Sequence, residues 1–215
     1  MLHTQPRPTE MQETVFIVDD DEAVRDSLQW LIETEGYQVK TYADPELFLE
    51  QLVWPQPCVL LLDIRMPKLS GLEVQKTLNE RGIPIPIVFI TGHGDVTLAV
   101  ETMKNGAVDF LEKPFDEGKI KDLIHQHMRL AHELAQTAKL DEQINKLYSK
   151  LTTRELQVLE RIVSGRLNKQ IADDLNISIK TVEAHRANIM DKLQVTTVAD
   201  LLKIALRKSP ELAQP

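Results

Sequence analysis

Three short apolar runs in this chain each end in charged side chains of the types used in phosphoryl transfer. These are Asp19 and Asp20 after the first run, Asp63 after the second and Lys113 after the third. Parallel strands bring their carboxyl ends to one edge of a sheet, so these side chains are expected to meet there. Carboxylates that converge repel one another unless a cation lies between them. The pattern therefore predicts a divalent metal beside a reactive carboxylate, with a lysine opposite.

The segments that must position these residues alternate between strand and helix patterns. Strands are predicted at 14–18, 38–42, 58–63, 86–91 and 107–112, and helices at 22–35, 45–53, 71–81, 95–105 and from about residue 116. The connections are short and rich in turn residues. This order predicts an α/β doubly wound, five-stranded parallel sheet, whose ligands bind at the carboxyl ends of the strands.

Charge is distributed unevenly along the 215 residues, which carry a net charge of −8. Residues 1–150 hold 15 Lys and Arg against 25 Asp and Glu, whereas residues 151–215 hold 10 against 8. This asymmetry indicates different partners for the two parts. No apolar run approaches the ~20 residues that cross a membrane, so no membrane partner is expected. The single Cys58 lies in an apolar strand and indicates a buried thiol in a reducing cytoplasm.

A long segment between Lys119 and Ser149 contains no Gly or Pro and repeats apolar residues at intervals of three to four. One interpretation is a continuous helical stalk that pairs with a second copy as a coiled coil, because an exposed apolar stripe is unstable alone. The other is two shorter helices folded onto the adjacent domains. Polar residues at His127, Thr137 and Asp141 interrupt the stripe and leave both interpretations open.

The remaining segment, residues 151–208, is predicted to be a small all-α domain. Thr152 and Glu155 have the spacing of a capping box at the start of its first helix. Asn168 is expected to cap a short second helix, and Ser178 a longer third one. Two helices joined by a short turn, the second longer and polar on its outer side, indicate a helix-turn-helix.

Four motifs at the predicted strand ends resemble the receiver domain of bacterial response regulators, in order and spacing. They are Val18-Asp19-Asp20-Asp21-Glu22, Leu62-Asp63-Ile64-Arg65-Met66-Pro67, Ile90-Thr91-Gly92-His93-Gly94 and Phe110-Leu111-Glu112-Lys113-Pro114. A lone Asp-Asp pair would carry little weight, whereas four linked motifs are specific.

The resemblance implies a role for each of these residues. Asp63 would be the nucleophile that takes a phosphoryl group from a sensor histidine kinase. The Mg²⁺ cofactor would be held by Asp19, Asp20, Asp63 and the backbone carbonyl of Arg65. Lys113 and Thr91 would contact phosphoryl oxygens, Phe110 would act as a switch by packing alone, and Pro114 would be cis. Asp21 is ambiguous and is also suited to cap the first helix.

Three further motifs resemble the LuxR-type helix-turn-helix, and together with the receiver pattern they are similar to the FixJ-like branch of response regulators. They are Leu151-Thr152-Thr153-Arg154-Glu155, Asn168-Lys169-Gln170-Ile171-Ala172 and Ser178-Ile179-Lys180-Thr181-Val182-Glu183-Ala184-His185. The resemblance implies that the helix 178–192 enters the major groove of promoter DNA. The candidate DNA-binding residues are Lys169, Lys180, Thr181, Glu183, Ala184, Arg186 and Ala187, while Val182, Ile189 and Leu193 are expected in the core. Glu183 suits either base reading or a solvated helix surface.

These patterns divide the chain into a disordered tail (1–12), a receiver domain (13–130), a helical linker (131–148), a LuxR-type domain (149–208, motif about 168–187) and a second tail (209–215). The resulting hypothesis is a phosphorylation-dependent bacterial transcription regulator that forms a homodimer when phosphorylated. It is not an enzyme beyond catalysing its own phosphoryl uptake and loss. A small phosphatase or kinase of the aspartyl-phosphate type, or a DNA-binding protein whose receiver no longer takes phosphate, are the two alternatives.

Overall fold

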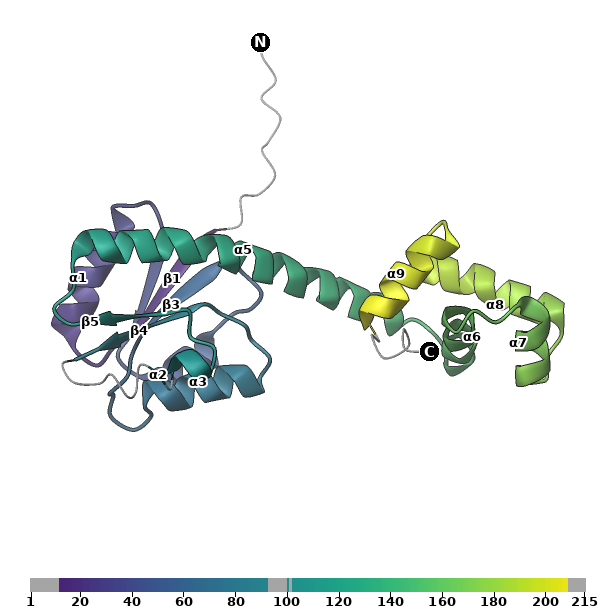
Figure 1. Cartoon of the computed structure of the whole chain (residues 1–215), viewed down its shortest axis with the longest axis horizontal. Helices are drawn as coiled ribbons and strands as arrows, with labels where there is room; N and C mark the ends of the chain where they lie inside the picture. Colours follow the sequence, from purple (N-terminus) through teal and green to yellow (C-terminus); the bar gives the residue numbers. More distant parts are fainter. Residues whose placement is uncertain (1–11, 93–99, 101, 209–215) are drawn as a thin grey trace, which may run out of the picture. The chain divides into compact units, whose positions relative to one another are not determined.

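Two compact units make up the protein, divided between residues 137 and 138. The computed structural model describes residues 12–92, 100 and 102–208. In the first unit, five parallel strands form one sheet in the order β2-β1-β3-β4-β5 (Figure 1). The strands are β1 (Thr14–Val18), β2 (Gln38–Tyr42), β3 (Cys58–Asp63), β4 (Ile87–Thr91) and β5 (Asp109–Glu112). The predicted doubly wound sheet is confirmed.

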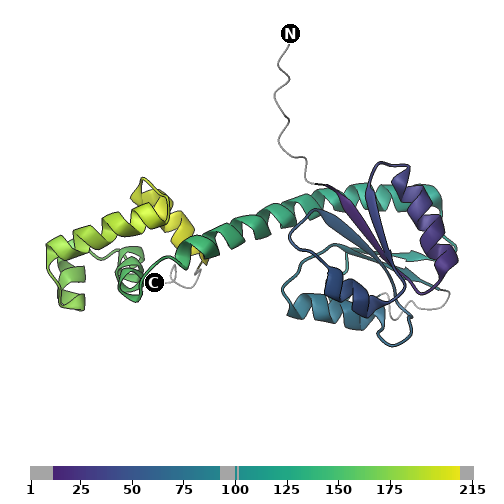
Figure 2. The same cartoon turned by 180° about the vertical axis from the view of Figure 1, so that it is seen from behind.

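Helices cover both faces of this sheet. They are α1 (Glu22–Glu33), α2 (Pro45–Gln51), α3 (Gly71–Glu80) and the long α5 (Glu117–Tyr148). Figures 1 and 2 show α1 and α5 on one face and α2 and α3 on the other. Most predicted bounds agree with the structure, whereas α1, α2 and α3 end one to two residues earlier than predicted and β4 and β5 begin one to two residues later. The helix predicted at 95–105 lies largely outside the described residues, although residues 100 and 102–104 are helical.

Strands β1 to β4 supply side chains to two separate hydrophobic cores, because successive residues point to opposite faces. In β1, Val15 and Ile17 pack toward α1 and α5, while Phe16 and Val18 pack toward α2 and α3. Cys58 belongs to the second core and is fully buried, as predicted, and burial raises the pKa of its thiol to about 12. Continuous apolar strands are required when both faces are covered in this way.

The long helix α5 has the continuity that the first interpretation of its apolar stripe predicts. It is one continuous helix of 32 residues, so the expectation of two shorter helices is wrong. Its apolar positions are nevertheless used locally: Ile120 and Leu123 are buried in the core beside α1, and Leu147 packs against the helical core of the second unit. The apolar residues at these positions are therefore already covered within the chain, and no second copy is needed to cover them.

Between these ends, α5 carries a buried histidine and exposed leucines. His127 is 6% exposed, and its Nε2 lies 3.8 Å from a carboxylate oxygen of Asp109 in β5. By contrast, 37% of Leu130 and 44% of Leu140 are exposed. Only this middle stretch keeps apolar surface that pairing of two copies would cover.

The second unit contains four further helices around its own core. They are α6 (Thr153–Val163), α7 (Asn168–Leu175), α8 (Ile179–Lys192) and α9 (Val198–Lys208). Val182, Ile189 and Leu193 are buried there, as predicted. Asn168 is not the cap of α7: Leu167 takes that position, and its backbone N–H donates to Oε1 of Gln170 at 2.9 Å. The turn between α7 and α8 uses Asn176 in the left-handed conformation (φ 52°), which asparagine tolerates.

Glu155 fastens α6 to α8 as well as capping its own helix. The predicted capping box is confirmed, since Glu155 Oε2 accepts from the Thr152 backbone N–H at 2.8 Å and the Thr152 hydroxyl oxygen accepts from the Glu155 backbone N–H at 3.2 Å. Both carboxylate oxygens also accept from Lys192 Nζ, at 2.9 and 2.7 Å. Glu155 is only 3% exposed. A buried carboxylate is stable only when it is paired and hydrogen-bonded in this way.

A close backbone approach links the start of α3 to the end of β3. Gly71 N–H donates to the carbonyl of Ile64 at 3.0 Å, and a Cβ at position 71 would lie 2.3 Å from the carbonyl oxygen of Asp63. No real side chain fits at that distance. Gly71 therefore allows α3 to begin directly beneath Asp63.

Gly71→Ala should destabilise the first unit, because either α3 or the end of β3 must shift to make room. By analogy with other overpacked sites, the loss is about 1–3 kcal/mol in the free energy of unfolding, measured by urea denaturation. Gly118→Ala is the matched control at the start of another helix, α5. There the nearest atom is 3.0 Å away and belongs to the side chain of Asp116, so the loss should be much smaller. Equal losses in the two variants would contradict this assignment.

Glu155→Gln should destabilise the helical unit by about 1–3 kcal/mol, since it leaves Lys192 without its charged partner. Although burial alone would raise the pKa of Glu155, hydrogen bonds from Lys192 and Thr152 lower it overall. A carboxyl group with a lowered folded-state pKa contributes stability above its unfolded pKa, near 4.3, and loses it as pH falls through the folded value. Urea melts across pH 3–7 should therefore show a smaller acid-induced loss in Glu155→Gln. Parallel profiles for the two proteins would contradict the pairing.

Candidate functional site

The charged residues at the strand ends meet around one cavity, as the sequence predicts. Lys113 Nζ lies 2.8 Å from Oδ2 of Asp19 and 2.8 Å from Oδ1 of Asp63. Their strands are β1, β3 and β5, which are not all adjacent in the sheet. The cavity measures about 340 Å³ and is lined by Asp19, Asp20, Asp21, Asp63, Ile64, Arg65, Thr91, Gly92 and Lys113. One ammonium group thus bridges two carboxylates from separate strands.

Burial controls the electrostatics of this cluster. Desolvation raises the pKa of Asp63, and the nearby charge of Asp19 raises it further, while hydrogen bonds from Lys113 and from the backbone of Arg65 oppose the increase. Burial alone would lower the pKa of Lys113, but its two carboxylate partners outweigh that effect and raise it. Lys113 therefore stays charged at neutral pH, and the carboxylates keep a positive neighbour.

Asp63 is held at both of its carboxylate oxygens. Oδ1 accepts from Lys113, and Oδ2 accepts from the backbone N–H of Arg65 at 2.6 Å. The residue is 6% exposed and opens onto the cavity. This arrangement fixes the carboxylate direction before any substrate arrives, which is the positioning that phosphoryl transfer requires.

The expected switch residues lie at the neighbouring strand ends. Thr91 is 4% exposed and lines the cavity, and its backbone carbonyl accepts from Lys113 N–H at 2.8 Å. Phe110, on β5, is 42% exposed. The Lys113–Pro114 peptide bond is cis, as the resemblance implied. His93 and Gly94 of the expected loop lie outside the described residues.

The three aspartates of the acidic loop after β1 differ in burial and in their hydrogen bonds. Asp19 is fully buried, whereas Asp20 is exposed and lines the cavity. The Asp21 side chain accepts from Ala23 N–H at 2.9 Å and caps α1, as anticipated. Arg25, on the first turn of α1, donates to the carbonyl of Asp19 at 2.7 Å. Sequence reasoning missed Arg25, because its only signal was its position six residues after Asp19 in a charged helix start.

The donors around the cavity suit a hard divalent cation. Four carboxylates line it against the single ammonium of Lys113, so negative charge is in excess. In the part of the chain that the structure describes, no three His, Cys, Asp or Glu side chains are close enough to hold a metal among themselves. Mg²⁺ does not need such a cage, since it binds one or two carboxylates together with waters and phosphate oxygens. The oxygen-only donor set therefore fits Mg²⁺.

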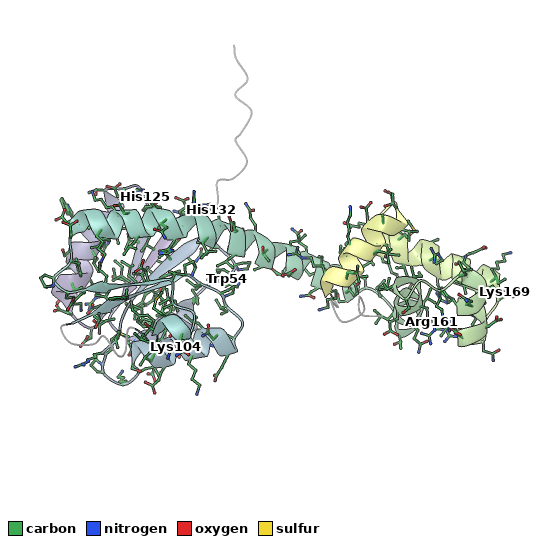
Figure 3. All side chains as sticks on the ribbon, viewed as in Figure 1. Trp54, Lys104, His125, His132, Arg161 and Lys169 are labelled. Carbon is green, nitrogen blue, oxygen red and sulfur yellow. The ribbon has the colours of Figure 1, made fainter. Side chains whose placement is uncertain are left out.

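The second unit presents its candidate DNA-binding residues on one exposed surface. Lys180, Thr181, Glu183, Ala184 and Ala187 of α8 are exposed, and Arg186 is half-buried. Lys180, Ala184 and Ala187 lie on the side of α8 opposite the buried Val182 and Ile189, whereas Thr181 and Glu183 flank that side and Arg186 lies beside the buried stripe. Lys169 lies exposed on α7, and its side chain points away from the helical core (Figure 3). All seven predicted residues are thus accessible to a partner.

Two family models match the chain along most of its length. One, described as the response regulator receiver domain, matches residues 15–125. The other, described as bacterial regulatory proteins of the luxR family, matches residues 149–205. Each match falls entirely within one compact unit. Among the described residues, no helix is long and apolar enough to span a membrane.

Curated relatives and solved structures match nearly the whole chain. FixJ of Bradyrhizobium diazoefficiens is 40% identical, over 90% of this chain and 94% of that protein. TmoT of Ectopseudomonas mendocina, a response regulator protein, is 40% identical over 94% and 92%. The structure of the response regulator StyR is similar with a TM-score of 0.74, at 44% identity over 90% and 98%. The structure of full-length FixJ from B. japonicum is similar with a TM-score of 0.54, at 38% identity over 94% of this chain and 99% of that chain.

The matches to StyR and to full-length FixJ therefore span both the sheet unit and the helical unit. The family is that of transcription regulators and not of conventional enzymes. The chain belongs to the two-component response regulators of the FixJ-like family, in which a receiver domain controls transcription through a LuxR-type DNA-binding domain.

Proposed function

We propose that Asp63 accepts a phosphoryl group from a sensor histidine kinase, and that the phosphorylated chain binds promoter DNA as a homodimer through α8. The observation that carries the first part is the position of Lys113, 2.8 Å from both Asp19 and Asp63 at the cavity edge. A fixed cation beside a buried carboxylate stabilises the negative charge that a transferred phosphoryl group brings.

In the reaction, a carboxylate oxygen of Asp63 forms a bond to phosphorus while the phosphorus–nitrogen bond of the phosphohistidine breaks. The electron pair leaves with the imidazole, which takes a proton from solvent. Lys113 holds the carboxylate in place and then contacts a phosphoryl oxygen, and the Thr91 hydroxyl contacts another. The chain catalyses only this uptake and the later hydrolysis of its own acyl phosphate.

Receiver domains generally bind Mg²⁺ at the phosphorylation site, and we assign the ion here to specific donors. Asp19, Asp20, Asp63 and the backbone carbonyl of Arg65 would hold it at the cavity. When bound, Mg²⁺ supplies positive charge that offsets the repulsion between the carboxylates and the incoming phosphoryl group. Asp19 contributes even without the ion, because its buried carboxylate keeps Lys113 oriented.

Phosphorylation would reach the rest of the domain through the ends of β4 and β5. The backbone bond between Lys113 and Thr91 ties these strand ends together. A phosphoryl group that draws in the Thr91 hydroxyl and the Lys113 ammonium shifts both strands, and the exposed ring of Phe110 repacks by contact alone. The signal is thus a population shift toward the arrangement that the modified site favours.

DNA recognition would follow the exposed surface of α8. Lys169, Lys180 and Arg186 are placed for phosphates, and Glu183 and Ala184 for base edges, with Thr181 and Ala187 beside them. The helical domain has little net positive charge, so one copy should bind weakly. A homodimer that reads two half-sites compensates for this weakness.

Asp63→Asn should abolish phosphoryl uptake while the protein stays folded, because the amide keeps the shape but lacks the nucleophile. Incubation with acetyl phosphate and Mg²⁺ followed by intact-mass measurement is the test. The unmodified chain should gain one phosphoryl mass and the variant none. Asp26→Asn, an exposed aspartate on α1, is the control and should behave like the unmodified chain. A phosphoryl gain in Asp63→Asn would place the acceptor elsewhere.

Phosphorylation should also raise the molecular mass of the protein in solution. Sedimentation equilibrium of the full chain, with and without acetyl phosphate, should show a shift from monomer toward dimer. Asp63→Asn under the same conditions should not shift. A modified protein that remains monomeric at concentrations where it binds DNA would rule out dimerisation as the activating step.

Substitutions on α8 should separate affinity from specificity. Lys180→Ala should weaken binding similarly on all sequences and lower the salt slope of the binding constant by about 1. Glu183→Ala should relax the preference at one base position of each half-site by roughly 1–3 kcal/mol. Binding to a panel of singly altered operators measures both, with Lys203→Ala on α9 as a control for lost charge. If Glu183→Ala leaves every base preference unchanged, Glu183 is a solvated helix residue.

A further inference from the structure

Arg25 holds the backbone of the acidic loop from the side of α1. Its Nη1 donates to the carbonyl oxygen of Asp19 at 2.7 Å, while its own backbone N–H bonds to the carbonyl of Asp21 at 3.1 Å. A hydrogen bond from a charged group is shorter and stronger than one between neutral groups. The guanidinium therefore fixes the direction of the Asp19 carbonyl.

That carbonyl belongs to the same planar peptide unit as the N–H of Asp20. Fixing its oxygen therefore fixes the plane from which Asp20 projects. The other polar groups of Asp19 are occupied by different partners: its N–H donates to Tyr42 O at 3.2 Å, Oδ1 accepts from Asp21 N–H at 2.9 Å, and Oδ2 accepts from Lys113. None of these bonds acts on the Asp19–Asp20 peptide plane.

Asp20 depends on this plane more than Asp19 does. Asp20 is exposed and lines the cavity, and within the described residues no hydrogen bond or ion pair involves its carboxylate. The Asp19 side chain, by contrast, is fully buried and bonded at both oxygens. The orientation of Asp20 toward the cavity is thus determined by its backbone.

We propose that Arg25 is a positioning residue for Mg²⁺: it fixes the Asp19–Asp20 peptide so that the Asp20 carboxylate is directed at the ion. This inference rests on the proposed function of the cavity. The Arg25 guanidinium also adds a positive charge next to three consecutive carboxylates, which lessens their mutual repulsion before the ion binds. Arg25 itself does not line the cavity.

A purely structural role is the competing explanation, and the chain offers a matched control for it. Arg81 Nη1 donates to the carbonyl of Leu49 at 2.8 Å, which is the same kind of bond at a place that does not line the cavity. Arg25→Gln and Arg81→Gln each remove one guanidinium-to-carbonyl bond from the same domain. Only the first should change metal binding.

The experiment measures the Mg²⁺ dissociation constant of the full chain by calorimetry, together with its melting temperature in EDTA. Arg25→Gln should weaken Mg²⁺ binding by about 10-fold or more, the range seen when a residue that orients a metal ligand is removed. Arg81→Gln should bind Mg²⁺ as the unmodified chain does. Uptake of phosphoryl from acetyl phosphate should need correspondingly more Mg²⁺ in Arg25→Gln and approach the normal rate at saturation.

Arg25→Lys keeps the charge and a donor, so its affinity should lie between those of the unmodified chain and Arg25→Gln. It also serves as the test if Arg25→Gln does not fold, with weakened Mg²⁺ binding expected and unchanged binding counting against the proposal. Unchanged Mg²⁺ binding in a folded Arg25→Gln, or equal weakening in Arg81→Gln, overturns the inference. Failure of the proposed function gives a different result, in which the unmodified chain takes up no phosphoryl group although the Mg²⁺ affinities still differ.

Discussion

The charge balance around Lys113 is the constraint on which the receiver site depends. Two carboxylates from separate strands, Asp19 and Asp63, are largely removed from water within reach of one ammonium group. Removing that ammonium would leave two like charges in a poorly solvated place, which costs far more than a surface ion pair contributes. The parallel sheet meets this constraint by bringing the carboxyl ends of β1, β3 and β5 to one edge. The helices and loops then only have to supply backbone donors, such as the N–H of Arg65.

The same solution recurs in the DNA-binding domain with a structural purpose. Glu155 is buried, yet it accepts from its own helix start and from Lys192 on α8. The carboxylate accepts four hydrogen bonds from three donor groups, the Thr152 N–H, the Thr152 hydroxyl and Lys192 Nζ, and so links the two helices. The buried carboxylate of Glu155 therefore helps to hold α8, which carries the candidate DNA-binding surface.

The sequence was sufficient to predict what depends on short-range patterns. Alternating apolar runs and turn residues indicated the sheet, and the capping spacing of Thr152 and Glu155 indicated the start of α6. It was not sufficient where a long helix packs differently along its length: the interrupted stripe in α5 left two interpretations open, and only the structure shows that its two ends pack in two separate cores. Arg25 was missed because its side chain bonds to a backbone carbonyl, which every residue type has, so the residue types do not reveal the contact. The candidate residues of α8 came from the resemblance to the LuxR-type helix-turn-helix, and the structure shows that all of them except the half-buried Arg186 are exposed.

The two hydrophobic cores of the sheet and the core of the helical domain share no buried side chain. A substitution that empties part of one domain's core therefore leaves the packing of the other intact. Core mutants of this chain should accordingly fall into two phenotypic groups, one that no longer responds to the kinase and one that no longer binds the promoter. In the proposed homodimer, a cell that carries one mutant of each group would form mixed dimers with one intact receiver and one intact DNA-binding domain, so the outcome of that cross reports whether both must reside in the same subunit.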